Sequence, residues 1–358
     1  MDCTNISVIY DTEWLKQMHC SDHNAYSIFR TNILQAMKTG EPGFSFRFFD
    51  YEKLVLANAC NEVISEDDSD VCNLGSINLS RIETIEQFAT VVELATKFLI
   101  CGSLTADLPS EKTRVVREQN RLLGLGLMGV HEWLLMRGYK YEMNSEFRRW
   151  LEVYRDVSNS TAEAFCNRLG ISIPKRKRAI APTGSIAILA GTTSGIEPIF
   201  SVAYKRTYLG NKLDQENQSG QGFDTKPITE TIIDDTAKYL IAMGINPDKI
   251  ETSFDLSIDY ERRIKMQYDM QVYVDNAISS TINLPAWGSE YNNESTIDSM
   301  TQCVQNYCTG LRGLTFYPNG ARAGQPLVPI EYKEALKSKE QKIIIHDICS
   351  IANKSTCG

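Results

Sequence analysis

The chain has 358 residues, of which 42% are hydrophobic and 23% are charged, and its net charge at pH 7 is −8. These values are typical of a folded globular protein and exclude wholesale disorder. An acidic surface repels phosphate backbones, so we expect no general binding to nucleic acid. Charged residues interrupt the longest apolar stretches too soon for a bilayer span, and the N-terminal segment has no apolar signal core, so we expect a cytoplasmic protein with no membrane contact.

Ten cysteines are spread along the chain. In a reducing compartment we expect no disulfide framework, and single thiols can then be reactive. Most free cysteines are small buried hydrophobes, so a catalytic function has to be argued from particular positions. His19, Cys20 and His23 have no second pair of ligands, and the chain has only 4 histidines, so we predict no bound metal.

Helices and short strands alternate along the chain. Strands are predicted at 43–49, 73–79, 178–182, 279–284 and 314–317. Periodicity predicts helices at 84–100, at 145–169 with Ser145 as cap and Gly170 as stop, at 228–243 between Pro227 and Gly244, and at 294–309. The polar stretch 210–226 is predicted to be a surface loop, and 331–358 a flexible tail carrying Cys349 and Cys357. The alternation favours an α/β fold with parallel strands.

Residues 124–129, GLGLMG, match the glycine pattern of dinucleotide-binding proteins. That pattern requires an apolar strand before it and an acidic residue about twenty positions after it. The preceding residues RVVREQNRLL are charged and have helical spacing. We therefore interpret the segment as a closely packed, glycine-rich helix and expect no nicotinamide cofactor.

The most informative segment is 57–81, which contains ANACNEV, an acidic turn and VCNLGSINLSR. Asn58, Cys60 and Glu62 alternate along a backbone that we expect to be extended, which would place all three on one face. A carboxylate can act as general base, an amide can bind a hydroxyl, and a thiol can act as nucleophile or hydrogen-atom donor. Cys72 offers a second thiol across a hairpin-like connection. The segment alone fits a half-buried strand with a buried cysteine equally well.

The pattern NxCxE followed by CNLGSINL resembles the active-site segment of the catalytic subunit of ribonucleotide reductases. Other segments resemble that family in the same order along about 1–325, namely 4–8 (TNISV), 39–43 (TGEPG), 121–129, 181–186 (APTGSI), 193–198 (TSGIEP), 274–275, 279–285 and 310–322. The resemblance implies that 1–330 is the second half of a ten-stranded α/β barrel with a central finger loop at about 56–64. It implies that Cys60 becomes a thiyl radical that abstracts the 3′ hydrogen, that Glu62 takes the 3′ hydroxyl proton and that Asn58 holds the ribose hydroxyls.

The resemblance also implies substrate-binding and redox residues. Cys72 would be one of two thiols that supply reducing equivalents. The turn Pro182, Thr183, Gly184, Ser185 and Ile186 would bind the phosphates of a nucleoside di- or triphosphate through backbone N–H groups. Cys349 and Cys357 would pass electrons from thioredoxin or glutaredoxin to the active-site pair, the alternative being two unrelated tail cysteines.

The family's first barrel half, its effector loops and its second redox cysteine have no counterpart in this sequence. Half of a barrel would leave open sheet edges and exposed apolar surface. We therefore predict that a separate N-terminal chain completes the barrel and that the two together reduce ribonucleotides. The alternatives are a fragment of a longer subunit, and a non-catalytic remnant or assembly partner.

The radical source is indicated by GLTFYPNGAR at 313–322. Family members driven by a separate diiron subunit carry two adjacent tyrosines there, whereas Tyr317 follows Phe316. Phenylalanine has no ionisable proton to couple to its oxidation, so the pattern favours adenosylcobalamin. The alternative is no directly bound cofactor and a radical from a diiron subunit. A glycyl-radical enzyme would need a glycine loop near the C-terminus, which 322–327 does not resemble.

Overall fold

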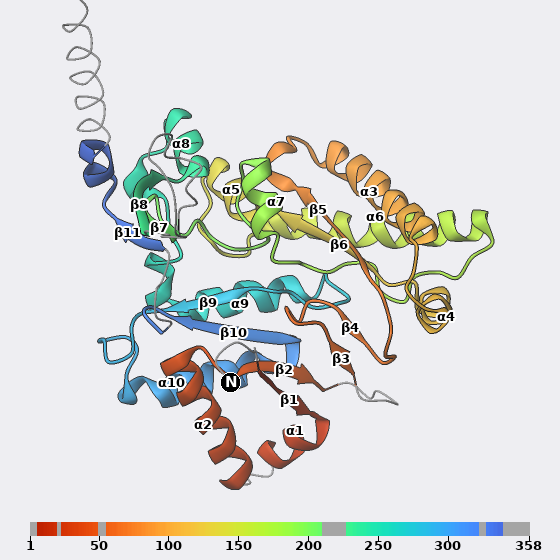
Figure 1. Cartoon of the computed structure of the whole chain (residues 1–358), viewed down its shortest axis with the longest axis horizontal. Coiled ribbons are helices and arrows are strands. Elements are labelled where there is room, and N and C mark those ends of the chain that lie inside the picture. Colours follow the sequence, from red (N-terminus) through yellow and green to blue (C-terminus); the bar gives the residue numbers. More distant parts are fainter. Residues whose placement is uncertain (1–5, 20–22, 49–54, 210–226, 322–326, 339–358) are drawn as a thin grey trace, which may run out of the picture.

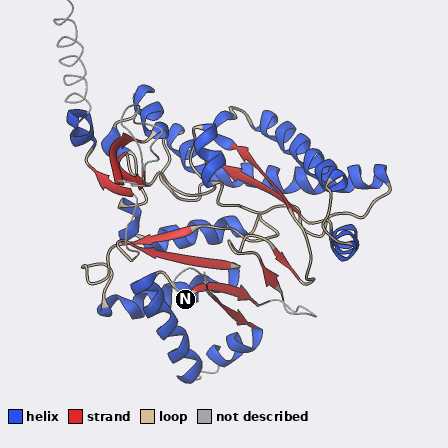
Figure 2. Ribbon diagram, in the orientation of Figure 1, coloured by secondary structure: helices blue, strands red, loops and turns tan. Residues whose placement is uncertain are grey.

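The computed structural model of the chain describes residues 6–19, 23–48, 55–209, 227–321 and 327–338. Cys20, the predicted loop at 210–226, and the tail cysteines Cys349 and Cys357 lie outside these residues. Strands cross the middle of the described structure, and helices flank them (Figure 1, Figure 2). The predicted α/β class is confirmed.

The strands that cross the middle follow one another in a single order from edge to edge. The strands β1 (Ser7–Asp11), β2 (Gly43–Arg47), β10 (Gly313–Pro318) and β9 (Thr281–Leu284) form one sheet. Residues 176–180 continue it through bridges from Ile180 to Ile278 and from Arg178 to Leu125, which lies in β6 (Leu123–Met128). β5 (Asn73–Asn78) pairs with β6. All these pairs are parallel except β2 with β10, so β2 and β1 run against the rest.

The described helices are α1 (Thr12–His19), α2 (His23–Thr39), α3 (Ile85–Thr105), α4 (Glu111–Asn120), α5 (Val130–Met136), α6 (Ser145–Leu169), α7 (Gly184–Ala190), α8 (Asp235–Ala242), α9 (Tyr260–Gln271) and α10 (Ile297–Tyr307). Several of them cover one side of this sheet. One core joins β5 and β6 to helices α3 and α6, and a second joins β2, β9 and β10 to α2 and α10. Among the described helices, α3 has the length and composition of a membrane span, but Phe88, Val92 and Leu99 pack in the first core.

Side chains alternate between this helix-covered face and the opposite face, which we call the inner face. On β2, Phe44 and Phe46 lie in the second core, whereas Ser45 and Arg47 point to the inner face. Phe316 of β10 also packs in that core, edge-to-face on Phe44 with ring centroids 5.8 Å apart. The same alternation along the other strands gives the inner face mainly small and polar side chains, together with the apolar Ile9, opposite Ser45, and Leu74, which covers Gly124. Besides Tyr317, the small and polar ones are Cys72, Ser76, Gly124, Gly126, Ala179, Ala277, Ser279, Thr281, Asn283, Gly313 and Thr315.

The glycine-rich segment is a strand, so the predicted helix at 121–129 is wrong. α4 ends at Arg121, which has a positive φ of 44°, and the chain then enters β6. Leu123, Leu125 and Leu127 point into the first core, whereas the glycines face inward, where neighbouring strands leave no room for side chains. The alternation of leucine and glycine in β6 therefore fixes a strand, although the charged residues before it have helical spacing.

The other helix predictions agree with the structure in part. α3 and α6 are confirmed, and Gly170 ends α6 with a φ of 66°. The cap of α6 is Asn144, whose side chain accepts a hydrogen bond from the Phe147 N–H at 2.9 Å, and not Ser145. α10 fills most of 294–309, flanked by the 3-10 turns Glu294–Thr296 and Cys308–Gly310.

The predicted helix at 228–243 is wrong in its first half. Its first residues form β8 (Pro227–Ile233), because the β-branched run ITETII favours a strand. Asp234 then caps the shorter helix α8. β8 belongs to a separate antiparallel sheet with β7 (Ala203–Leu209) and β11 (Leu327–Ile330). Residues 332–338, assigned to the flexible tail, are helical and bury Ala335 against this sheet.

Close packing at the inner face gives a stability prediction. A Cβ on Gly126 would lie 2.6 Å from the Ala179 carbonyl oxygen, whereas a Cβ on Gly184 would meet open space. We expect Gly126→Ala to lower the free energy of unfolding by about 1–3 kcal/mol, because backbone has to move. Gly184→Ala should leave it unchanged. Urea denaturation of the two variants measures the difference, and equal midpoints would contradict this packing.

Candidate active site

The segment with the predicted catalytic residues is a β-hairpin. β3 (Leu56–Ala57) pairs with β4 (Ile64–Ser65), and the Asn61 N–H donates to the Asn58 carbonyl oxygen at 2.9 Å. Asn61 has a φ of 62°, which asparagine tolerates better than most residues. The expected extended backbone is therefore wrong here, because a β-turn whose last residue, Asn61, is left-handed closes the hairpin.

The three predicted residues consequently do not share one face. Cys60 is exposed at the tip, whereas Glu62 is only 2% exposed. The side-chain oxygen of Asn58 accepts a hydrogen bond from the Val63 N–H at 3.1 Å, so this amide helps to close the turn. The Asn58 side chain is exposed, which leaves its amide nitrogen accessible to a ligand hydroxyl.

The hairpin lies on the inner face of the sheet. The Ala277 N–H donates to the Glu62 carbonyl oxygen at 2.9 Å, and Arg176 donates to the Ile64 carbonyl oxygen at 3.0 Å. Val55 and Ile64 pack on Ala277. In Figure 1 the hairpin lies next to β2, in agreement with the hydrogen bond from Ser45 to Asn61. The hairpin is therefore held at the amino ends of the parallel strands.

Glu62 lies near both predicted thiols. Partial burial raises the pKa of Cys60, although the residue is exposed overall, and the negative charge of Glu62 raises it further. Burial raises the pKa of Cys72 far above its usual range, and Asp70, Glu62 and Asp275 add to this shift. Cys72 shares the inner face with Gly124, where a Cβ would lie 3.2 Å from its Sγ. The charge of Glu62 thus acts on both the Cys60 and the Cys72 thiol.

The pKa values of the two thiols differ from those of a typical nucleophilic cysteine. A nucleophilic cysteine acts as a thiolate and is usually found where its pKa is lowered. Cys60 and Cys72 have raised pKa values and stay protonated at neutral pH. The two thiols therefore lack the lowered pKa of an activated nucleophile.

The Glu62 carboxylate has an oxygen that is free to accept a hydrogen bond. Its Oε2 is buried and has no hydrogen-bond partner among the described residues. Leaving a buried polar atom unpaired costs free energy, so such an atom needs an explanation. A ligand hydroxyl at the inner face would supply the missing partner.

The predicted phosphate-binding turn lies at the other end of the strands. Pro182–Ile186 follows residues 176–180 at their carboxyl end, whereas Arg176 contacts the hairpin at their amino end. Thr183 is buried with a φ of 54°, and its hydroxyl accepts a hydrogen bond from the Gly195 N–H at 2.8 Å. Gly184, Ser185 and Ile186 are exposed at the start of α7. A ligand would have to lie along the inner face to reach both the turn and the hairpin.

Sequence reasoning missed the residues that hold the hairpin. Ser45 and Arg47 both donate to the Asn61 side-chain oxygen, at 3.1 and 2.9 Å. The signal was present in GFSFR, where small or polar residues alternate with phenylalanines, but its partner cannot be read from one strand. Within the described ranges, no group of three or more His, Cys, Asp or Glu side chains is arranged to hold a metal ion.

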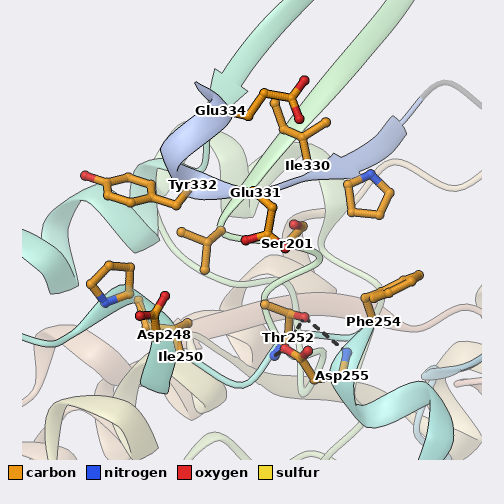
Figure 3. A pocket seen from close by; sticks show the side chains of 13 residues that line it. Ser201, Asp248, Ile250, Thr252, Phe254, Asp255, Ile330, Glu331, Tyr332 and Glu334 are labelled. Atoms are coloured by element: carbon orange, nitrogen blue, oxygen red, sulfur yellow. Dashed lines mark hydrogen bonds between the residues drawn. The ribbon is translucent and has the colours of Figure 1, made fainter. Parts of the chain in front are cut away.

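A cleft of about 510 Å³ lies elsewhere, between β11 with the residues that follow it and the segment 247–255 (Figure 3). Its lining includes Asp248, Asp255, Glu331 and Glu334, and none of the predicted site residues. These carboxylates would repel a nucleotide phosphate. The cleft is therefore not a second candidate for the nucleotide site.

The comparisons with known proteins agree with the resemblance found in the sequence. The family model "Ribonucleotide reductase, barrel domain" matches residues 8–164 and 176–317. The chain is 27% identical over 320 residues to a putative adenosylcobalamin-dependent ribonucleoside-triphosphate reductase of Mycobacterium phage D29, covering 78% of this chain and 46% of that protein. It is 29% identical over 288 residues to a vitamin B12-dependent ribonucleoside-diphosphate reductase of Mycobacterium tuberculosis (strain CDC 1551 / Oshkosh), covering 72% and 40%.

A solved structure gives the same result for the fold. The crystal structure of a B12-dependent (class II) ribonucleotide reductase superposes with a TM-score of 0.72 at 16% identity, over 94% of this chain and 49% of that one. The chain thus spans less than half the length of these proteins. From the family match, which covers most of its length, the chain belongs to the ribonucleotide reductase barrel-domain family.

Proposed function

We propose that this chain carries the radical site of a ribonucleotide reductase, with Cys60 as the thiyl residue. The observation that carries the proposal is the hairpin tip, where an exposed, protonated thiol lies beside a buried carboxylate without a partner. A remnant without activity would have no reason to keep this costly carboxylate. The family match also removes the support for a glycyl-radical enzyme.

Each residue has a defined role in the proposed reaction. The Cys60 thiol loses its hydrogen atom, and the resulting thiyl radical takes the 3′ hydrogen atom of the ribose. Glu62 accepts the proton of the 3′ hydroxyl, while the exposed Asn58 amide binds the ribose hydroxyls. The 2′ hydroxyl leaves as water. Cys72 and a second thiol outside this chain supply two electrons and two protons and become a disulfide, and Cys60 then returns the hydrogen atom to C3′.

Adenosylcobalamin is the proposed cofactor, as the names of the relatives suggest. When bound, it would supply the one-electron oxidation of the thiol. The hairpin tip fits close approach of such a bulky group, because Leu56, Ala57 and Ala59 are exposed and uncharged beside Cys60. A route through β10 from a diiron subunit is not favoured, since Phe316 lies in the core behind the sheet, away from the inner face.

The substrate is proposed to be a ribonucleoside di- or triphosphate that lies along the inner face. Its phosphates would meet the backbone N–H groups of Gly184, Ser185 and Ile186 next to Pro182 and Thr183, and its ribose would meet the hairpin. Cys349 and Cys357, outside the described residues, are proposed to receive electrons from thioredoxin or glutaredoxin. A cytoplasmic location is part of the same proposal.

The remaining barrel strands are proposed to come from a separate N-terminal polypeptide. Among the described residues, no strand pairs with the outer edges of β1 and β5. Unpaired strand edges of this kind are usually covered by further strands or by another chain. Ile9, opposite Ser45, and Leu74, over Gly124, are 46% and 44% exposed on the inner face, which the rest of a barrel would cover.

The test is deoxynucleotide formation by this chain purified from its native lysate with its bound partners. We expect 2′-deoxynucleotides with adenosylcobalamin and none without it, and a co-purifying chain that supplies the missing strands. Activity without the cofactor would contradict the cobalamin assignment and favour a separate metal-loaded subunit. A stable, monomeric chain that reduces nucleotides alone would refute the need for a partner.

A further inference from the structure

The residue between Cys60 and Glu62 has an unusual conformation and unusual contacts. Asn61 has a φ of 62°, a region that glycine adopts without strain. Its side chain is half-buried, whereas Asn58 and Cys60 in the same turn are exposed. The side chain of Asn61 therefore has partners that glycine at this position would lack.

Those partners lie on two strands. The Asn61 side-chain oxygen accepts hydrogen bonds from Ser45 Oγ at 3.1 Å and from an Arg47 guanidinium nitrogen at 2.9 Å. Arg47 is 5% exposed and also donates to the carbonyl oxygens of Phe46 and Arg312, at 2.9 and 2.6 Å. Hydrogen bonds from a buried guanidinium are among the stronger ones in proteins. The Arg47 guanidinium is therefore itself fixed by backbone carbonyl oxygens.

The nitrogen end of the same amide occupies a space that a glycine leaves open. A Cβ on Gly313, at the start of β10, would overlap the Asn61 amide nitrogen. Apart from the Asn61 amide group, the nearest atom to this Cβ would be the Phe44 carbonyl oxygen at 3.6 Å, an ordinary contact distance. The Asn61 amide thus lies between β2 and β10, and it fills the space that the missing side chain of Gly313 leaves.

We infer that Asn61 is a positioning residue whose amide clamps the hairpin turn between β2 and β10 and so fixes the Cys60 thiol relative to the Glu62 carboxylate. On the other side of the turn, the bond from Ala277 to the Glu62 carbonyl oxygen holds the backbone. The two anchors together define where the tip lies. That the clamp affects catalysis rests on the proposed function. That Asn61 holds the hairpin in place does not.

The clamp is tested by the reactivity of Cys60 in the full 358-residue chain, without cofactor, substrate or partner. Asn61→Gly keeps the backbone conformation and removes the amide. A loosened tip removes the remaining partial burial of the thiol and moves it away from Glu62, and both changes lower its pKa. We expect iodoacetamide to alkylate Cys60 roughly fivefold faster or more at neutral pH, with a lower pH midpoint. Buried Cys166 should stay unmodified, which shows that the fold is intact.

A double-mutant cycle with Gly313→Ala separates a clamp from general loosening. In the native background the new methyl group displaces the Asn61 amide, so Cys60 alkylation should accelerate. Added to Asn61→Gly, the methyl group enters free space and should change nothing further. An unchanged rate in Asn61→Gly, or additive effects in the double variant, would overturn the inference. Because no turnover is measured, this outcome is independent of whether the chain reduces nucleotides.

Discussion

Replacing Cys60 by alanine in the assembled enzyme is expected to lower deoxynucleotide formation by roughly a thousandfold or more. The reason is that the proposed reaction begins at this sulfur, and no other described thiol lies exposed on the hairpin. Cys60→Ser should have the same effect, because an oxygen–hydrogen bond is too strong to replace the thiol. Product formation from a ribonucleotide, followed by chromatography of the deoxynucleotide, measures the loss.

The matched control is Cys101→Ser, which changes an exposed cysteine on α3, away from the hairpin. It should retain the native rate. Because Cys60 is exposed, its truncation leaves no cavity, so thermal melting of Cys60→Ala should match that of the native chain. A Cys60→Ala enzyme with native turnover would end the thiyl proposal, whatever its cofactor requirement.

Replacing Glu62 by glutamine should lower the turnover rate by about 10²- to 10⁴-fold, the usual contribution of a general base. The change keeps the size of the side chain and removes its charge. It also removes one cause of the raised pKa of Cys60 and of Cys72. The pKa of the Cys60 thiol should therefore fall, its thiolate fraction at a given pH should rise, and its alkylation by iodoacetamide should become faster while turnover becomes slower.

This opposite response distinguishes a local electrostatic effect from damage to the hairpin. Glu66→Gln is the control, since Glu66 follows β4 on the same hairpin but does not contribute to the pKa shift of either thiol. It should leave both the alkylation rate and turnover unchanged. Native turnover in Glu62→Gln would show that the proton of the 3′ hydroxyl goes elsewhere.

The long helices and the α/β class could be predicted from the sequence, because their signals are local. α6 has the predicted bounds, since an amphipathic run ends at Gly170. β6 was missed because its glycines are required by a neighbour distant in sequence. Its leucines pack in the first core, whereas Gly126 lies against the Ala179 backbone, and this contact cannot be read from the segment itself. The bounds of β8 were missed because a β-branched run and a helix adjoin at Asp234 without a glycine or proline between them.

The identities of the site residues could be predicted, but their arrangement could not. Asn58, Cys60 and Glu62 stood out by chemistry and resemblance, and period-two spacing then suggested one shared face. The left-handed conformation of Asn61 breaks that period. It is stabilised by Ser45 and Arg47, which are distant in sequence, so no local pattern could reveal it. The environment of Glu62 likewise depends on Ala277, far along the chain.

Every described hydrogen bond that joins the hairpin to the sheet comes from β2, from residue 176 or from residue 277. These three segments are distant from one another in the sequence, and the last two are also distant from the hairpin. A substitution in any of them would therefore displace the hairpin tip, even where residues 56–65 are unchanged.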